Sequence, residues 1–248
     1  MAKQLMIYER AVPVSIEAHK GWSVKSENNF GFAREVNSVP VLAAEFAPAA
    51  MEYTIIFAGD GDVVFPSVIL GMKEGNNAHV KADGTWDGRY VPAFFRRYPF
   101  VFAASDDQST FTLCIDEEYE GLNKKGKGER LFDAEGERTQ YLENVLAFST
   151  EYQAQFTRTQ AFAKRLQDLD LLEPAQAQFS LAGGERTQLS GFKTINREKL
   201  RNLPAETLAE MAKTDELELC YLHLQSLNNL TPMTQRIAAR NAADDDSK

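Results

Sequence analysis

The most unusual chemistry of this sequence lies in residues 86–100, which read WDGRYVPAFFRRYPF. Six aromatic residues, three arginines and two prolines fall within these fifteen positions. Trp, Tyr and Arg contribute much of the binding energy at buried contact sites, and a proline holds the residue before it in an extended conformation. The composition therefore predicts a rigid, non-helical segment that presents large side chains in defined directions. We call residues 86–100 the aromatic–arginine segment.

Side chains of this segment, together with two from elsewhere, are candidates for binding a ligand: Trp86, Tyr90, Arg96, Arg97, Tyr98, Glu45 and His19. In one interpretation, an arginine lies over an aromatic ring and receives a carboxylate or peptide ligand with its planar guanidinium. In the other, the rings fill the core, and Arg96 and Arg97 pair with carboxylates across a sheet. We favour the structural interpretation, because adjacent residues on a strand point to opposite faces.

The remaining residues with chemical potential are scattered. The histidines His19, His79 and His223 form none of the spacings that zinc sites use. His223 is expected in the core, whereas the polar neighbours of His19 predict an exposed side chain. Cys114 and Cys220 have apolar neighbours and are expected to be small buried thiols. The sequence contains no phosphate-binding loop and no nucleophile elbow, and we expect neither a metal nor a cofactor.

An enzyme is nevertheless a competing hypothesis. It would need Glu45, His19, Asp116 or His223 to gather in space, since no catalytic motif joins them in sequence. The acidic group at residues 116–118 has a simpler interpretation as the solvated end of a strand.

Composition and charge limit the classes of protein. The 248 residues are 44% hydrophobic and 25% charged, as in ordinary globular proteins. The formal charge of −9 and the pI near 5.0 argue against a nucleic-acid partner, because phosphate contacts need a basic face. The N-terminus lacks the apolar run of a signal peptide, and no apolar stretch approaches the length of a membrane span. We therefore expect a cytoplasmic protein without membrane insertion.

Short extended segments dominate up to about residue 118. Residues 53–57 and 63–72 predict a β-hairpin, and residues 111–115 predict a further strand. Residues 39–46 also predict a strand, in which Glu45 is the exception to the apolar pattern. This carboxylate is expected to face solvent at the strand end, or else to be buried with Arg96 or Arg97 as its partner.

The periodicity changes at Thr139, a candidate N-cap. Apolar residues then recur every three or four positions, which predicts one long amphipathic helix that ends before Pro174. Residues 178–195 suggest a second hairpin. Helices are expected from Asn196, from Pro204 and over residues 216–228.

Strands followed by helices, without regular β–α–β alternation, predict an α+β fold. The expected arrangement is a mainly antiparallel β portion, at about residues 1–118, packed on the long helix. A small hairpin and a helical C-terminal portion follow, with helices dominating residues 139–230. We expect a single domain over residues 1–235 and a disordered tail at 236–248.

The order of short motifs resembles the SapC family of bacterial proteins over residues 5 to about 230. The motifs are NSVP (37–40), AEF (44–46), YTIIF (53–57), DGTW (83–86), YVP (90–92), RRYPF (96–100), CID (114–116) and LLEP (171–174). One departure is NAH at 77–79, where the family pattern has Asn-Leu-Phe. His79 is for this reason left out of any candidate site.

The resemblance implies a role in the cell envelope or in nutrient uptake. The family takes its name from a surface-layer locus, and its members look to be encoded beside TonB-dependent receptors. The resemblance implies no reaction and no catalytic residue. The sequence thus favours a non-enzymatic peptide- or protein-binding or adaptor protein. The alternatives are an enzyme that modifies an amino acid or peptide, and a structural component of a surface layer. The oligomeric state is left open.

Overall fold

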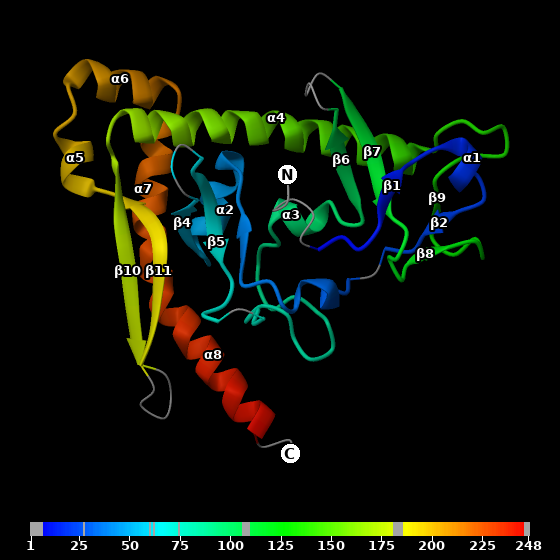
Figure 1. The fold of residues 1–248 in the computed structure, drawn as a ribbon, viewed down its shortest axis with the longest axis horizontal. Helices are drawn as coiled ribbons and strands as arrows, with labels where there is room; N and C mark the ends of the chain where they lie inside the picture. The colour runs from blue at the N-terminus through cyan, green and yellow to red at the C-terminus, as the bar shows by residue number, and fades with distance from the viewer. Residues whose placement is uncertain are drawn as a thin grey trace.

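The structure is a computed structural model that describes residues 7–26, 28–59, 61, 63–73, 75–105, 110–180 and 186–245. It combines antiparallel sheets with helices, as Figure 1 shows, and this confirms the expected α+β fold. Its strands are β1 (Ala11–Pro13), β2 (Ser23–Val24), β3 (Ser38–Pro40), β4 (Thr54–Ala58), β5 (Phe65–Ile69), β6 (Phe100–Ala104), β7 (Phe111–Asp116), β8 (Leu122–Asn123), β9 (Glu129–Arg130), β10 (Leu172–Ser180) and β11 (Arg186–Ile195). Its α-helices are α1 (Ile16–His19), α2 (Phe46–Ala50), α3 (Ala93–Arg96), α4 (Gln140–Asp168), α5 (Arg197–Arg201), α6 (Ala205–Lys213), α7 (Glu216–Ser226) and α8 (Leu230–Asp245).

The largest sheet has five strands in the order β10-β11-β4-β5-β3. Its centre is the antiparallel hairpin β4–β5, in register from Thr54 opposite Ile69 to Ala58 opposite Phe65. The hairpin β10–β11 joins it through the pairing of β11 with β4. Both expected hairpins are therefore confirmed, the second with longer strands than the sequence indicated.

A second, three-stranded sheet has the order β1-β7-β6, and a small third sheet has the order β8-β2-β9. The expected strand at residues 111–115 is β7, the central strand of the second sheet. This sheet carries its own apolar cluster, in which Phe100 and Ile115 pack against Leu142 of α4. Burial of such apolar area is the main stabilising contribution to a domain of this kind.

Helix α4 connects the two larger sheets. It runs along one side of the molecule, with its N-terminal half over β6 and β7 and its C-terminal half over the five-stranded sheet (Figure 1). Thr139 is the N-cap, as expected, and its side-chain oxygen accepts a hydrogen bond from the Leu142 N–H. Phe162 and Leu166 are buried in the main core, with 2% and 0% of their surface exposed. The apolar residues that recur with a 3.6-residue period are thus the residues with which α4 packs along most of its length.

Helix α8 differs from the sequence-based expectation. A disordered tail was expected from Arg236 onward, but α8 continues to Asp245. Ile237 is buried beside Met233, and Arg236 donates hydrogen bonds to Asp87. An Ala- and Asp-rich composition favours disorder only where no apolar side chain reaches the core. Here Ile237 does reach it, and α8 includes residues 236–245.

The aromatic–arginine segment also differs from its expected form. Instead of a continuous extended segment, it contains the helical turn α3, and only Phe100 belongs to a strand. Arg96 ends α3 and Arg97 is its C-cap, so the argument from opposite faces of a strand does not apply to them. Residues 43–45 form a 3₁₀ turn, η3 (Ala43–Glu45), where the sequence predicted strand.

His223 confirms its expected place in the core. Its side chain, on α7, is completely buried, and its ring lies 5.0 Å from the ring of Phe57. Its Nε2 accepts a hydrogen bond from the Ile195 N–H at 3.1 Å, so this nitrogen carries no proton. Burial lowers the pKa of His223 to about 3.

This burial predicts a pH-dependent loss of stability. The pKa of His223 in the folded protein lies below its value of about 6.5 in the unfolded chain. The unfolded state therefore binds this proton more tightly and gains it first on acidification. Between pH 7 and pH 5, His223 should lower the free energy of unfolding by about 2 kcal/mol. We expect the His223→Gln variant to lose this contribution in urea unfolding at the two pH values. Parallel pH profiles for the two proteins would contradict the prediction.

Candidate ligand-binding cleft

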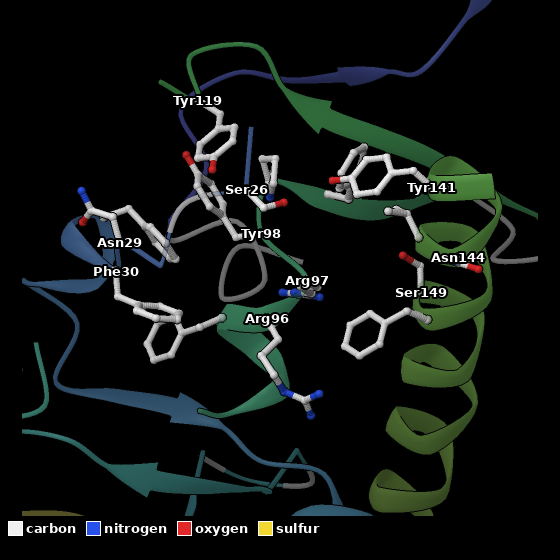
Figure 2. Close-up of a pocket in the computed structure, with 16 residues that line it drawn as sticks. Ser26, Asn29, Phe30, Arg96, Arg97, Tyr98, Tyr119, Tyr141, Asn144 and Ser149 are labelled. Atoms are coloured by element: carbon white, nitrogen blue, oxygen red, sulfur yellow. The ribbon is translucent and has the colours of Figure 1, made fainter. Parts of the chain in front are cut away.

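A cleft of about 390 Å³ lies between α4 and the aromatic–arginine segment. One wall is the face of α4 that carries Tyr141, Asn144 and Ser149 (Figure 2). Phe148 of α4 also lines the cleft. The opposite wall comes from residues 95–100, from Tyr119 and from four residues nearer the N-terminus, namely Ser26, Asn29, Phe30 and Phe32. Its volume falls at the lower end of the range for small-molecule sites, about 300–1,000 Å³.

Arg97 is the candidate residue nearest the centre of the cleft in Figure 2. Its side chain is buried, with 6% of its surface exposed. Its guanidinium carbon lies 4.6 Å from the ring centroid of Phe94 and 4.7 Å from that of Tyr152. Such cation–π contacts favour a positive charge that has been removed from water. Arg97 is therefore a cation held in place by aromatic rings at the wall of the cleft.

Arg96 lines the cleft but directs its head group elsewhere. It is exposed, and in Figure 2 its guanidinium extends away from the centre of the cleft. Its Nε donates to the Val91 carbonyl at 3.1 Å, and its Nη2 donates to the Tyr90 hydroxyl at 3.3 Å. Its guanidinium carbon also lies 5.4 Å from the ring centroid of Phe148. The two adjacent arginines thus have different environments and different roles.

Tyr98 forms part of the aromatic wall. Its ring stacks on that of Phe32 with a centroid distance of 4.2 Å and meets Tyr119 edge-on at 5.3 Å. Its hydroxyl donates to Oδ2 of Asp116 at 3.4 Å. Burial and the negative charge of Asp116 raise the pKa of Tyr98 above its ordinary value. Tyr98 consequently keeps its proton and remains a donor to this carboxylate.

Glu45 lies behind the cleft as a buried carboxylate, with 4% of its surface exposed. This corrects the expectation that it faces solvent. Oε1 accepts from the Tyr90 hydroxyl at 2.6 Å and from the Ala93 N–H at 2.7 Å, while Oε2 accepts from the Leu42 N–H at 3.0 Å. Arg96 is linked to this carboxylate through the Tyr90 hydroxyl, to which both residues hydrogen-bond. Glu45 therefore fixes the start of α3 and the position of Tyr90.

Trp86 belongs to a neighbouring aromatic cluster rather than to the wall of the cleft. Its Nε1 donates to the Tyr90 carbonyl at 3.0 Å, and its ring stacks on His79 with a centroid distance of 5.6 Å. Phe30 meets it edge-on at 5.5 Å and also lines the cleft. Trp86 thus supports the cleft from outside it, through Phe30 and the backbone of residue 90.

His19 and Asp116 are both completely buried, contrary to the expectation that they face solvent. Nε2 of His19 lies 3.4 Å from a carboxylate oxygen of Glu117, and its Nδ1 lies 3.2 Å from the backbone of Ser15. Asp116 accepts hydrogen bonds from the backbone N–H groups of Glu9, Arg10 and Glu118. His19 is near the second sheet and is not among the described residues that line the cleft.

The four candidates for catalysis occupy separate environments. Glu45 is bound to the start of α3, Asp116 to the backbone near the N-terminus, His19 to the turn of α1, and His223 to β11. Within the described ranges, no three His, Cys, Asp or Glu side chains form a group that could hold a metal ion.

The contribution of α4 to the cleft was not predicted from the sequence. Tyr141, Asn144, Phe148 and Ser149 recur at spacings of three, four and one along one face of the helix. The apolar members of this pattern predict core packing, and Tyr141 and Phe148 are only partly exposed. Burial raises the pKa of Tyr141 to about 12, so that its hydroxyl is a neutral donor. The interruption of an apolar stripe by Asn144 and Ser149 was the available signal for a polar cleft wall.

Fold and cleft together define an α+β protein in which a long helix closes an aromatic, arginine-containing cleft over antiparallel sheets. The family model described as SapC matches residues 14–233, and the chain belongs to the SapC family. No curated protein sequence and no solved structure matches the chain. In the part of the chain that the structure describes, every helix is too short or too polar to span a bilayer.

Proposed function

We propose that this SapC-family protein is a non-enzymatic binding or adaptor protein that takes a peptide or a protein segment into the cleft. The observation that carries the proposal is the position of Arg97, a buried cation at the wall of an aromatic cleft. Aromatic residues and arginine dominate binding energy where partners bury side chains. A cleft of this volume would hold one or two residues of such a partner.

The four polar side chains from opposite walls support a peptide ligand. Asn144 and Ser149 project from α4, while Ser26 and Asn29 lie on the facing segment. Such groups satisfy backbone N–H and C=O groups of a bound peptide, which would otherwise lose their hydrogen bonds with water. We place this activity in the cytoplasm, in connection with envelope or TonB-dependent uptake systems, as the family resemblance implies.

The proposal is tested by filling the cleft. Asn144 is exposed on the cleft face of α4, and the Asn144→Trp substitution would occupy the space between the walls. Ala147 is also exposed on α4 but is not among the lining residues, so Ala147→Trp is the matched control. We expect peptides selected from a randomised synthetic library to bind Asn144→Trp at least about tenfold more weakly than the parent protein.

Ala147→Trp should bind these peptides like the parent protein. Failure to select any peptide, or selected peptides that bind Asn144→Trp undiminished, would overturn the proposal. Ordered self-assembly of the purified protein would instead support a surface-layer component.

A further inference from the structure

The charge of the cleft is unusual for this protein. The chain as a whole carries a formal charge of −9. Among the described residues that line the cleft, however, the charged side chains are Arg96 and Arg97. The Arg96 head group hydrogen-bonds to Tyr90 and lies 5.4 Å from the ring of Phe148, whereas the Arg97 guanidinium lies nearer the centre of the cleft (Figure 2). A site of this polarity favours a ligand that carries a negative charge.

The geometry of Arg97 specifies the kind of negative charge. The rings of Phe94 and Tyr152 lie 4.6 and 4.7 Å from its guanidinium carbon and restrain the side chain. A guanidinium donates hydrogen bonds in its own plane through five N–H groups. It can therefore receive a carboxylate in addition to acceptors that the protein itself provides. The planar fork matches the two oxygens of a carboxylate, and a restrained fork loses little entropy on binding.

The walls specify the rest of the ligand. The stacked rings of Tyr98 and Phe32 form one apolar wall, and Phe148 of α4 lies on the other. Aromatic rings in such a site favour a further ring in an offset or edge-to-face arrangement. The volume of about 390 Å³ accommodates one aromatic residue with its backbone but not a folded domain.

We infer that the cleft binds the C-terminus of a peptide that ends in an aromatic residue, with the α-carboxylate on Arg97 and the ring between Tyr98 and Phe148. The inference rests on the proposed function and names the part of the peptide that the cleft recognises. Conversion of the terminal carboxylate to an amide removes the charged group that Arg97 would bind. The aromatic ring and the rest of the backbone stay unchanged.

Isothermal titration with matched peptides tests the inference. The probes are acetyl-Ala-Ala-Phe with a free carboxylate, the same peptide as its amide, and acetyl-Ala-Ala-Ala with a free carboxylate. We expect the phenylalanine acid to bind at least about tenfold more tightly than either of the others, the gain typical of a charge-assisted hydrogen bond or of a buried ring. Each ratio is measured within one protein preparation and is independent of small differences in folded fraction.

The Arg97→Lys variant keeps the charge but lacks the planar fork, and we expect its preference for the acid over the amide to fall below about threefold. Arg158→Lys is the matched control, because Arg158 is an exposed arginine of α4 outside the cleft lining. Should Arg97→Lys unfold, Ser149→Ala removes a hydroxyl near Arg97 from the α4 wall and should also reduce the preference.

The outcomes separate this inference from the proposed function. Equal binding of acid and amide, blocked by Asn144→Trp, would overturn the inference and leave peptide binding intact. If acetylphenylalanine binds as tightly as the tripeptide, the ligand is a small aromatic acid. This result would overturn the inference that the cleft recognises the C-terminus of a peptide. If no peptide binds in a manner sensitive to Asn144→Trp, both fail.

Discussion

Replacement of Asp116 by alanine is expected to lower the free energy of unfolding by about 3–5 kcal/mol. The carboxylate is completely buried at the end of β7. It accepts hydrogen bonds from the backbone N–H groups of Glu9 and Arg10, both at 2.9 Å, and from that of Glu118 at 3.2 Å. Alanine leaves these part-buried donors, and the hydroxyl of Tyr98, without their acceptor, and an unsatisfied donor that has been removed from water costs about 1–3 kcal/mol. Urea unfolding followed by circular dichroism measures the change.

Two further variants isolate the role of this carboxylate. Asp116→Asn keeps one acceptor oxygen and should lose less, about 1–3 kcal/mol. Asp168→Ala removes an exposed carboxylate that pairs with Lys164 on α4, and its effect should stay within about 0.5 kcal/mol. An Asp116→Ala variant as stable as Asp168→Ala would show that the buried hydrogen bonds contribute little.

Local periodicity was sufficient to predict the long helix and both hairpins. The helix expected from Thr139 to the approach of Pro174 is observed as α4 (Gln140–Asp168). The turn residues between β-branched segments placed β4 and β5 correctly. Each of these elements repeats a short-range pattern over many residues, so a single sequence contains the information that specifies it.

The buried carboxylates could not be predicted in this way. The backbone donors that hold Asp116 at Glu9 and Arg10 are 107 and 106 positions away in sequence. Glu45 receives its Ala93 donor from 48 positions away. A carboxylate can be buried when such donors replace its hydrogen bonds with water. The residues next to it in the sequence do not show whether distant donors will reach it. The default expectation of a solvated acid therefore failed at Glu45 and Asp116.

The turn α3 was missed for a different reason. A proline restricts the residue before it to extended conformations, which predicts extended structure before Pro92 and before Pro99. The rule does not restrict the residues that follow, and the fixed φ of proline suits the start of a helix. Pro92 is the N-cap of α3, so the same residue ends the extended part and begins the helical turn.

The two buried carboxylates fix the aromatic–arginine segment from both ends. Glu45 holds the hydroxyl of Tyr90 and the N–H of Ala93 before α3, and Asp116 holds the hydroxyl of Tyr98 after it. Arg97 lies between these attachments. The position of the Arg97 guanidinium thus depends on two carboxylates whose hydrogen bonds go to neighbouring residues of the segment. Contacts between residues far apart in the sequence therefore shape the candidate site.

Replacement of Glu45 by alanine should therefore affect stability and the cleft together. We expect the free energy of unfolding to fall by about 3–5 kcal/mol, because the buried N–H groups of Leu42 and Ala93 and the hydroxyl of Tyr90 lose their acceptor. Glu45→Gln keeps one acceptor oxygen, but its amide N–H₂ group would face the donors of the other oxygen. We expect its free energy of unfolding to fall by about 1–3 kcal/mol. Glu143→Ala, at an exposed position of α4, is the control and should change stability by less than about 0.5 kcal/mol.

The effect on the cleft is measured on the fraction of Glu45→Gln that remains folded. Tyr90 is the acceptor of the Arg96 Nη2 hydrogen bond, and the Ala93 N–H lies in the first turn of α3. When both contacts are loosened, α3 and its C-cap Arg97 can move. Affinity for a peptide in the cleft should therefore fall several-fold, although Glu45 is not among the described lining residues. Titration of the folded variant at low temperature gives this affinity. Undiminished binding by a clearly destabilised Glu45→Gln protein would show that the cleft holds its shape without this carboxylate.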